Sequence, residues 1–394
     1  MTLLSRSSTA GDVFAAIADG TANTRSDLMR ATGLSRSTVT ERLDALFEAG
    51  LVKEADQRQP SGGRPSKRIV VNEEGHLVLA ADLGEDHSRL VVTDLAGHVL
   101  GERVGAIAVG GGPSPLLSWI AEQARELVAE LGRTAADLLG LGLAVPAPVD
   151  FARGQVVAPS VMTGWDGVDI QARFRELLDI PVLVENDVNA RGFGEYLQGW
   201  QDYDDVLYIK AGTGLGSAIL TGHDLYRGAQ GAAGDIGHIR LEPDGGPLCR
   251  CGAIGCVEAI AAGWAIVRDL AAAGMPVAST RDAIAAIRDN DPIAIHRVRE
   301  AGRVLGRAIA YTVNMLNPSL IIVGGSLTAA GDHLMLGIRE SVYQYSLPLA
   351  TRDLRIVPAR GDDRRGAIGM AHLIIKTSLQ PTQINGRIRS VRER

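Results

Sequence analysis

The three cysteines of this chain stand together, as Cys249, Cys251 and Cys256, and His238 lies upstream of them. Three thiolates and one imidazole are a complete tetrahedral ligand set for zinc, with no open position for a catalytic water. Glycines between the cysteines allow the tight turns that would bring all three sulfurs to one point. The clustering favours one structural zinc per chain, in a loop spanning 238–256, over three unrelated thiols.

This segment resembles the signature of the ROK family, which is named for its repressors, open reading frames and kinases. The chain reads Cys-Arg-Cys-Gly-Ala-Ile-Gly-Cys-Val-Glu from Cys249 to Glu258, and Gly-Asp-Ile-Gly-His from Gly234 to His238. The family usually has a glutamate at the position of Asp235. The resemblance covers about residues 77–380, and it implies the actin-like ATPase fold, with a cleft between two ribonuclease-H-like lobes.

The resemblance also implies a carbohydrate site in that cleft. A carboxylate suits such a site because it accepts hydrogen bonds from two neighbouring hydroxyls. Ala147 replaces a usual glycine and Ser160 a common asparagine, so the sequence leaves the identity of the sugar open. The positions that match the sugar-binding residues of the family are Asn186, Asp187, Asp235, His238 and Glu258. In kinases of the family, the position of Asp187 carries the catalytic base.

The nucleotide-binding motifs match only in part, so this site is expected to be degenerate. The first phosphate turn reads Asp-x-Gly-Gly-Thr in the kinases but ends in Glu85-Asp86 here. A carboxylate facing a phosphate at about 4 Å costs several kcal/mol in a partly dry cleft. We therefore expect no kinase activity, and the alternative is an ATP-dependent sugar kinase that also binds DNA. The matching positions are Asp82, Gly84, Gly212, Thr213, Gly214, Gly216, Gly324 and Gly325.

The first 76 residues predict a winged helix-turn-helix domain, which ROK regulators carry and free-standing ROK kinases lack. Apolar residues recur at helical spacing, Gly33 suits the tight turn, and Ser35 suits the cap of a third helix. Two short strands would follow at 51–54 and 68–71, with a basic loop between them as the wing. The residues predicted to contact DNA are Arg36, Ser37, Thr40 and Glu41 in the third helix, and Arg64 and Lys67 in the wing. The alternatives are a protein-interaction module and a solvated linker.

Composition describes an ordinary globular chain of 394 residues, with 46% hydrophobic and 22% charged residues and a net charge of −6. No apolar run is long enough for a membrane span, and the N-terminus has no signal-peptide pattern. Thiols committed to metal favour a reducing cytoplasm. Lysine occurs only at positions 53, 67, 210 and 376.

Alternating strand and helix patterns predict an α/β domain over 77–380 behind the DNA-binding domain. Its N-lobe would comprise about 77–195 with a helix at about 364–379, and its C-lobe about 196–363. Residues 381–394 are expected to form a flexible basic tail. The sequence thus predicts a sugar-responsive transcriptional repressor, released from a palindromic double-stranded operator by a small carbohydrate. A homodimer or a dimer of dimers would match such an operator.

Overall fold

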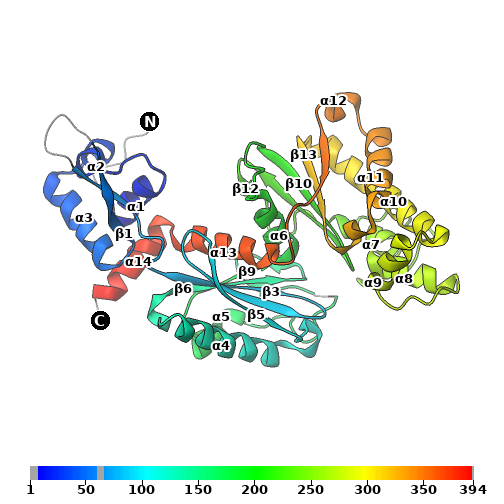
Figure 1. Cartoon of the computed structure of the whole chain (residues 1–394), viewed down its shortest axis with the longest axis horizontal. Coiled ribbons are helices and arrows are strands. Elements are labelled where there is room, and N and C mark those ends of the chain that lie inside the picture. The colour runs from blue at the N-terminus through cyan, green and yellow to red at the C-terminus, as the bar shows by residue number, and fades with distance from the viewer. Residues whose placement is uncertain (1–7, 60–65, 159, 393–394) are drawn as a thin grey trace.

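The computed structural model describes residues 8–59, 66–158 and 160–392. Figure 1 shows a small N-terminal domain at one end, a first lobe beside it and a second lobe at the other end. Each lobe is built on a five-stranded sheet. Within the described ranges, no helix combines the length and the apolar character that crossing a membrane requires.

The N-terminal domain is a helix-turn-helix followed by a two-stranded wing, as the sequence predicts. Gly33 ends the second helix in the left-handed conformation, with φ of 68°, and the Ser35 side chain caps the third. Val39, Leu43 and Leu46 are buried, which confirms the expected apolar face. The elements are α1 (Ala10–Ala18), α2 (Arg25–Thr32), α3 (Arg36–Glu48), β1 (Val52–Gln59) and β2 (Ser66–Val71).

The first lobe is a mixed sheet in the order β5-β4-β3-β6-β9, with two antiparallel pairs followed by two parallel pairs. Every residue of β6 is buried, because helices cover both faces of the sheet. The strands are β3 (Leu77–Leu83), β4 (Ser88–Thr93), β5 (Val99–Gly105), β6 (Leu138–Val145) and β9 (Val182–Asn186). The helices are α4 (Pro113–Glu130) and α5 (Ile170–Leu177) on one face, and α6 (Asp187–Tyr196) and α13 (Arg365–Ser378) on the other. Short elements are η1 (Val109–Gly111), η2 (Ala135–Asp137), β7 (Val149–Asp150) and β8 (Gln155–Val156).

The second lobe repeats this pattern in the order β12-β11-β10-β13-β14, which confirms the predicted pair of ribonuclease-H-like lobes. Its strands are β10 (Asp205–Ala211), β11 (Leu215–Thr221), β12 (Asp224–Leu225), β13 (Leu320–Gly324) and β14 (Arg355–Pro358). Its outer face carries α7 (Val257–Ala261), α8 (Gly263–Ala272), α9 (Thr280–Arg288), α10 (Pro292–Leu316) and α11 (Asp332–Tyr345). Short elements are η3 (Ile236–His238), η4 (Ser326–Ala330) and α12 (Pro348–Thr351).

A shared hydrophobic core joins the two lobes through α6 and α13, because it contains residues of both sheets and of both helices. The two helices approach each other closely at two glycines. A Cβ atom at Gly194 would lie 2.3 Å from the Arg365 carbonyl oxygen, and one at Gly369 would lie 1.9 Å from the Ala190 carbonyl oxygen. These positions therefore accept only glycine without moving a helix.

The expectation of a flexible tail at 381–394 is wrong for the described part of that segment. Residues Pro381–Arg392 form α14, which packs against α1 (Figure 1). Ile384 and Ile388 lie one helical turn apart and are buried in the core of the N-terminal domain. The arginines beside Ile388, at positions 387 and 389, obscured this two-residue apolar face in the sequence.

α14 also fixes the N-terminal domain against the first lobe. Asn385 accepts a hydrogen bond from the Gly11 amide at 2.9 Å and donates one to the Thr9 hydroxyl at 2.8 Å. Arg387 donates to the Ala136 carbonyl at 2.9 Å. Beside it, the Nε2 atom of buried His76 lies 2.7 Å from the carbonyl oxygen of Ala49, the residue that follows α3. The domain that holds α3 is thus clamped by the far end of the chain.

Ile384→Ala should lower the free energy of opening of α1 by about 2–5 kcal/mol, because it leaves a cavity in the core of the small domain. Hydrogen exchange of the α1 amides measures this opening free energy. Gln383→Ala is the matched control, since Gln383 is an exposed neighbour on the same helix. Equal exchange rates in the two variants would show that α14 does not support the domain.

Candidate functional site

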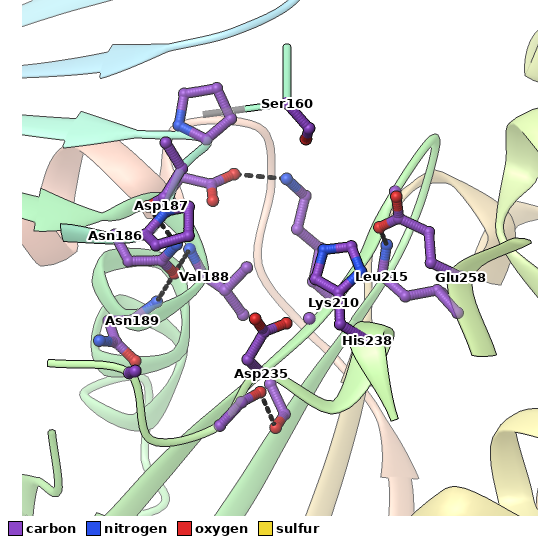
Figure 2. Close-up of a pocket in the computed structure, with 18 of the residues that line it drawn as sticks. Ser160, Asn186, Asp187, Val188, Asn189, Lys210, Leu215, Asp235, His238 and Glu258 are labelled. Atoms are coloured by element: carbon purple, nitrogen blue, oxygen red, sulfur yellow. Dashed lines mark hydrogen bonds and ion pairs between the residues drawn. The ribbon is translucent and has the colours of Figure 1, made fainter. Parts of the chain in front are cut away.

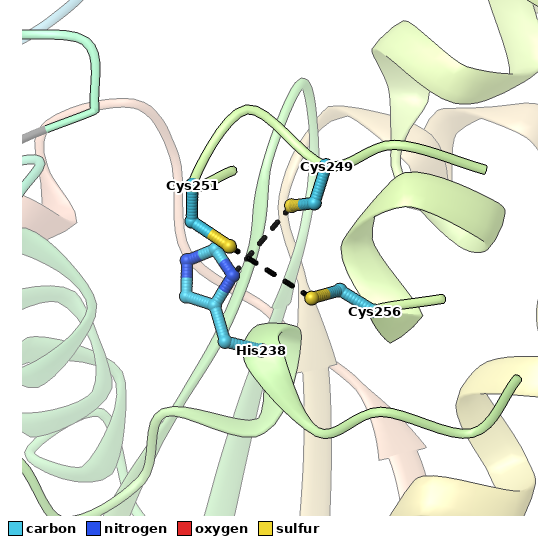
Figure 3. A group of neighbouring side chains, drawn as sticks. All are labelled: His238, Cys249, Cys251 and Cys256. Carbon is cyan, nitrogen blue, oxygen red and sulfur yellow. Dashed lines mark hydrogen bonds between the residues drawn. The ribbon is translucent and has the colours of Figure 1, made fainter. Parts of the chain in front are cut away.

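Four side chains meet in a metal-binding arrangement in the second lobe (Figure 3): His238, Cys249, Cys251 and Cys256. Their ligand atoms all lie within 4.8 Å of one another. His238 Nδ1 lies 3.7 Å from Cys249 Sγ, and the sulfurs of Cys251 and Cys256 are 3.8 Å apart. Ligands bound at 2.0–2.3 Å around a tetrahedral centre are separated by roughly 3.3–3.8 Å. The residues therefore fit a metal ion held in this geometry.

The backbone around the cluster explains how the loop brings the thiols together. Gly252 and Gly255 have φ angles of 86° and 75°, which side chains rarely tolerate. A Cβ atom at Gly255 would lie 1.8 Å from the Glu242 carbonyl oxygen. The Cys249 amide donates to the Ala253 carbonyl at 2.8 Å, which closes the turn.

A cavity of about 140 Å³ lies between the lobes. Figure 2 shows side chains from α6 of the first lobe and from β10, η3 and α7 of the second converging on it. The structure thus brings together all five residues that the resemblance assigned to the carbohydrate site. They are Asn186, Asp187, Asp235, His238 and Glu258.

The carboxylate of Asp187 forms an ion pair with the ammonium of Lys210 across the cavity. Asp187 is the first residue of α6, and Lys210 lies on β10 of the other lobe. Burial alone would lower the pKa of Lys210, but the Asp187 carboxylate outweighs this effect and raises it. The ammonium therefore stays charged and faces the carboxylate that a kinase would need as a base.

Hydrogen bonds within the protein use most of the donors and acceptors of the Asn186 side chain. Its Oδ1 atom caps α6 by accepting from the amides of Val188 and Asn189 at 2.9 and 3.3 Å. Its Nδ2 atom donates one hydrogen to the Ala147 carbonyl at 3.0 Å. One Nδ2 hydrogen is left to reach a ligand.

On the opposite wall, Glu258 and Asp235 present carboxylates to the cavity. Glu258 accepts a hydrogen bond from the Leu215 amide at 3.1 Å, which ties it to the glycine-rich turn before β11. Burial raises the pKa of Asp235, and the neighbouring Glu258 carboxylate adds to this shift. Ser160 also lines the cavity.

The positions that match nucleotide-binding residues are spread over several places, one of which is a second, larger hollow of about 1160 Å³. Thr213 lines this hollow, and so do Glu85 and Asp86 from the first lobe. Asp82 lies deeper, where it pairs with Arg191 at 3.2 Å and where burial raises its pKa against the pull of that arginine. Gly212, Gly214 and Gly216 form the turn before β11, and Gly214 and Gly216 border the smaller cavity. Gly84 lies in the β3–β4 hairpin, Gly324 ends β13, and Gly325 follows it with φ of 96°.

The predicted DNA-contacting residues of α3 lie at its N-terminal end. Arg36, Ser37 and Glu41 are exposed, and Thr40 is half-buried with its hydroxyl donating to the Arg36 carbonyl. In the wing, Lys67 pairs with Glu54. Arg64, the predicted minor-groove residue, lies outside the described residues.

Three charged residues of the cavity were not predicted as site residues: Glu85, Lys210 and Arg250. Lys210 is one of the few lysines and lies two residues before the glycine-rich turn, a placement that could have drawn attention to it. Arg250 stands between two of the cysteines, whose spacing dominated the interpretation of that segment.

Lys210→Met should lower the free energy of unfolding by about 3–5 kcal/mol, because it removes the ion-pair partner of the buried Asp187 carboxylate. Lys210→Met with Asp187→Asn should recover most of this loss. Urea denaturation checks both. Lys376→Met is the control, since Lys376 pairs with Asp224 at an exposed site, where the loss should stay below about 1 kcal/mol. Equal losses at the two lysines would contradict a buried pair.

Comparison with known proteins agrees with this architecture. A model of the ROK family matches residues 78–377, and one of the arsR family of bacterial regulatory proteins matches residues 16–54. The xylose repressor of Bacillus spizizenii is 27% identical over 89% of this chain and 91% of its own length. The transcriptional dual regulator NagC of Escherichia coli is 28% identical over 88% of this chain and 87% of its own.

Two solved structures, one of a regulator and one of a kinase, differ in how much of this chain they cover. A ROK family transcriptional regulator, a homologue of the E. coli MLC protein, has a TM-score of 0.79 and 28% identity, with 97% of this chain and 98% of that one covered. The ROK hexokinase of Thermus thermophilus has a TM-score of 0.65 and 29% identity, and covers 76% of this chain and 99% of its own. The family match spans both lobes and the metal loop, so this chain belongs to the ROK family and carries an N-terminal helix-turn-helix domain.

Proposed function

We propose that this protein is a transcriptional repressor that binds a palindromic operator and is released by a carbohydrate in the cavity between its lobes. The observation that carries the proposal is the clamping of a helix-turn-helix domain onto a ROK domain within one chain. The xylose repressor and the solved ROK transcriptional regulator align over both parts, whereas the hexokinase aligns over about three quarters of the chain.

Operator recognition is assigned to the exposed start of α3. Arg36, Ser37, Thr40 and Glu41 occupy the part of a recognition helix that reaches base edges in the major groove. The Lys67 ammonium, which pairs with Glu54 in the free protein, would exchange this partner for a phosphate. Arg64 is proposed to enter the minor groove from the wing.

The cavity suits a carbohydrate because it combines acceptors with a few donors in a small space. Asp235, Glu258 and one oxygen of Asp187 are available as acceptors. With Nδ1 of His238 on the metal, Nε2–H remains as a donor. The names of the relatives point to different sugars, so D-xylose and N-acetylglucosamine both belong in the panel that tests the proposal.

The four-residue cluster is assigned to one structural zinc ion per chain. Three thiolates and one imidazole are typical zinc ligands, and they complete its coordination. The ion would hold the metal loop and fix the orientation of His238 in the carbohydrate site, so it would act through position and not through catalysis. Thiolates that bind zinc also fit the proposed cytoplasmic location.

Phosphoryl transfer is not part of the proposed function. Glu85 and Asp86 place two carboxylates where the kinases of the family have a glycine and a threonine, and both line the larger hollow. Asp187, the position of the kinase base, is paired with Lys210. The alternative, a sugar kinase that also binds DNA, rests on the retained Asp187 and the turn Gly212–Gly216.

A homodimer is proposed because two recognition helices then meet the two halves of a palindrome. The second lobe offers an apolar surface for a second copy at the end of α10 and on α12. Met315 is 83% exposed and Leu349 73% exposed, and Tyr311 and Leu347 are exposed with them. Pairing of dimers into tetramers would add further operator contacts.

Elemental analysis should find close to one zinc ion per chain, and Cys251→Ser should lose it, because the remaining three ligands bind more weakly. The variant should also lose its response to sugar, since His238 is no longer held. Ala253→Ser, in the same loop, should keep both properties. Full zinc content in a Cys249→Ser/Cys251→Ser double variant would contradict the assignment.

Asp187→Asn should raise the sugar concentration needed for operator release about tenfold or more, because a carboxylate acceptor is replaced by an amide. Operator affinity without sugar should stay unchanged. Gel shifts with titration of each sugar in the panel measure both quantities. Release of the wild type by none of the sugars would count against the proposed function.

An ADP-release assay on the wild type, run beside the gel shifts, separates repressor from kinase. A kinase would turn over with its sugar and stop in Asp187→Asn, because the base is needed for proton removal. The proposed repressor should release no ADP with any sugar that displaces it from DNA.

A further inference from the structure

A charged contact between the lobes stands beside the carbohydrate cavity. Glu85 lies in the hairpin between β3 and β4 of the first lobe, and Arg250 lies in the metal loop of the second. The Arg250 guanidinium is 3.4 Å from the Glu85 carboxylate. Both residues line the carbohydrate cavity and also the larger hollow. Their ion pair therefore forms part of the boundary between the two spaces.

Arg250 is held in place from the side of its own lobe. Its guanidinium carbon lies 5.0 Å from the centre of the Trp264 ring, within the range of a cation–π contact. The two residues beside it in the sequence, Cys249 and Cys251, belong to the metal cluster. Arg250 thus moves as one unit with the second lobe, whereas Glu85 moves with the first.

Two deeper ion pairs also cross between the lobes, and their burial distinguishes them from this one. Arg227 of the second lobe binds Glu185 of the first at 2.6 Å, and the Glu185 side chain is 2% exposed. Lys210 and Asp187 form the second of these pairs. Breaking a buried pair costs several kcal/mol, so both should persist when the cleft opens.

Glu85 and Arg250, in contrast, are 37% and 38% exposed. An exposed pair contributes little, and solvent replaces it readily, so it can form and break as the cleft closes and opens. The contact also lies at the position where the first phosphate turn of a kinase departs from this sequence. In this chain the Glu85 carboxylate stands at that position and contacts Arg250 of the other lobe. The ion pair can therefore connect the lobes without a nucleotide phosphate between them.

We propose that Glu85 and Arg250 are positioning residues that latch the two lobes over a bound carbohydrate, in place of a nucleotide. This inference rests on the proposed function, because it takes the effector to be a carbohydrate in the cavity. The latch adds affinity for the carbohydrate through closure and need not itself touch the ligand.

The test measures carbohydrate affinity by calorimetry without DNA, in Glu85→Gln, Arg250→Gln and the double variant. The probe is whichever of D-xylose, D-glucose and N-acetylglucosamine displaces the wild type from operator DNA. Each single variant should bind about two- to fivefold more weakly, as expected for a half-exposed pair. The double variant should be no weaker than either single one, because both changes remove the same contact.

Asp86→Asn is the matched control, since it removes the same charge from the next residue, which lines the larger hollow but not the carbohydrate cavity. Its affinity should equal that of the wild type. The effect of Glu85→Gln should also shrink at high ionic strength, which screens an exposed pair. Zinc content equal to that of the wild type shows that Arg250→Gln keeps the metal loop folded.

Equal affinities of Glu85→Gln, Arg250→Gln and Asp86→Asn would overturn the latch, and so would losses that add in the double variant. In either case, displacement of the wild type by sugar would leave the proposed function standing. If none of the three sugars displaced or bound the wild type, the proposed function would fail, and the latch would fail with it.

Discussion

Helix α6 both lines the cavity and packs closely against α13, and the rest of the molecule is built around these two contacts. Its first residue, Asp187, faces the cavity, and Asn186 caps it there. Its flank packs against α13 so closely that Gly194 and Gly369 leave no room for a side chain. The wall of the cavity therefore cannot shift without displacing the helix pair that joins both sheets.

The same packing connects the cavity, the proposed carbohydrate site, to the N-terminal domain. α13 ends at Ser378, and α14 begins at Pro381 and runs along α1. His76 and Arg387 tie this junction to the end of α3 and to the first lobe. A ligand that prefers one arrangement of the lobes can thus bias the placement of α3, and a 100-fold preference corresponds to about 2.7 kcal/mol.

Features that depend on residues close together in the chain could be predicted from the sequence, whereas contacts between distant segments could not. The metal cluster, the glycine turn before α3 and the cap at Ser35 depend on residues close in the chain, and their types and spacing were sufficient. The family motifs likewise pointed to five residues that the structure places around one cavity, and their binding of a carbohydrate stays a prediction. The two-lobed fold followed from the same resemblance.

The features that could not be predicted from the sequence are contacts between distant segments. Asn385 binds the Gly11 amide across 374 positions, and Glu85 meets Arg250 across 165. No local pattern encodes such pairs, because they exist only after the sheets and helices have packed. The docking of α14 was missed for a related reason: two isoleucines among many arginines are a weak amphipathic signal until a partner core is known.

In the proposed repressor, the carbohydrate cavity and α3 are two sites of one coupled equilibrium. Linkage requires that operator DNA change the affinity for the sugar by the same factor by which the sugar changes the affinity for the operator. Calorimetric titration of the sugar into the free protein and into the protein saturated with operator measures the first factor, and anisotropy of labelled operator measures the second. We expect the sugar to bind more weakly to the protein on DNA, and the two factors to be equal. A sugar affinity that is the same with and without operator would contradict it.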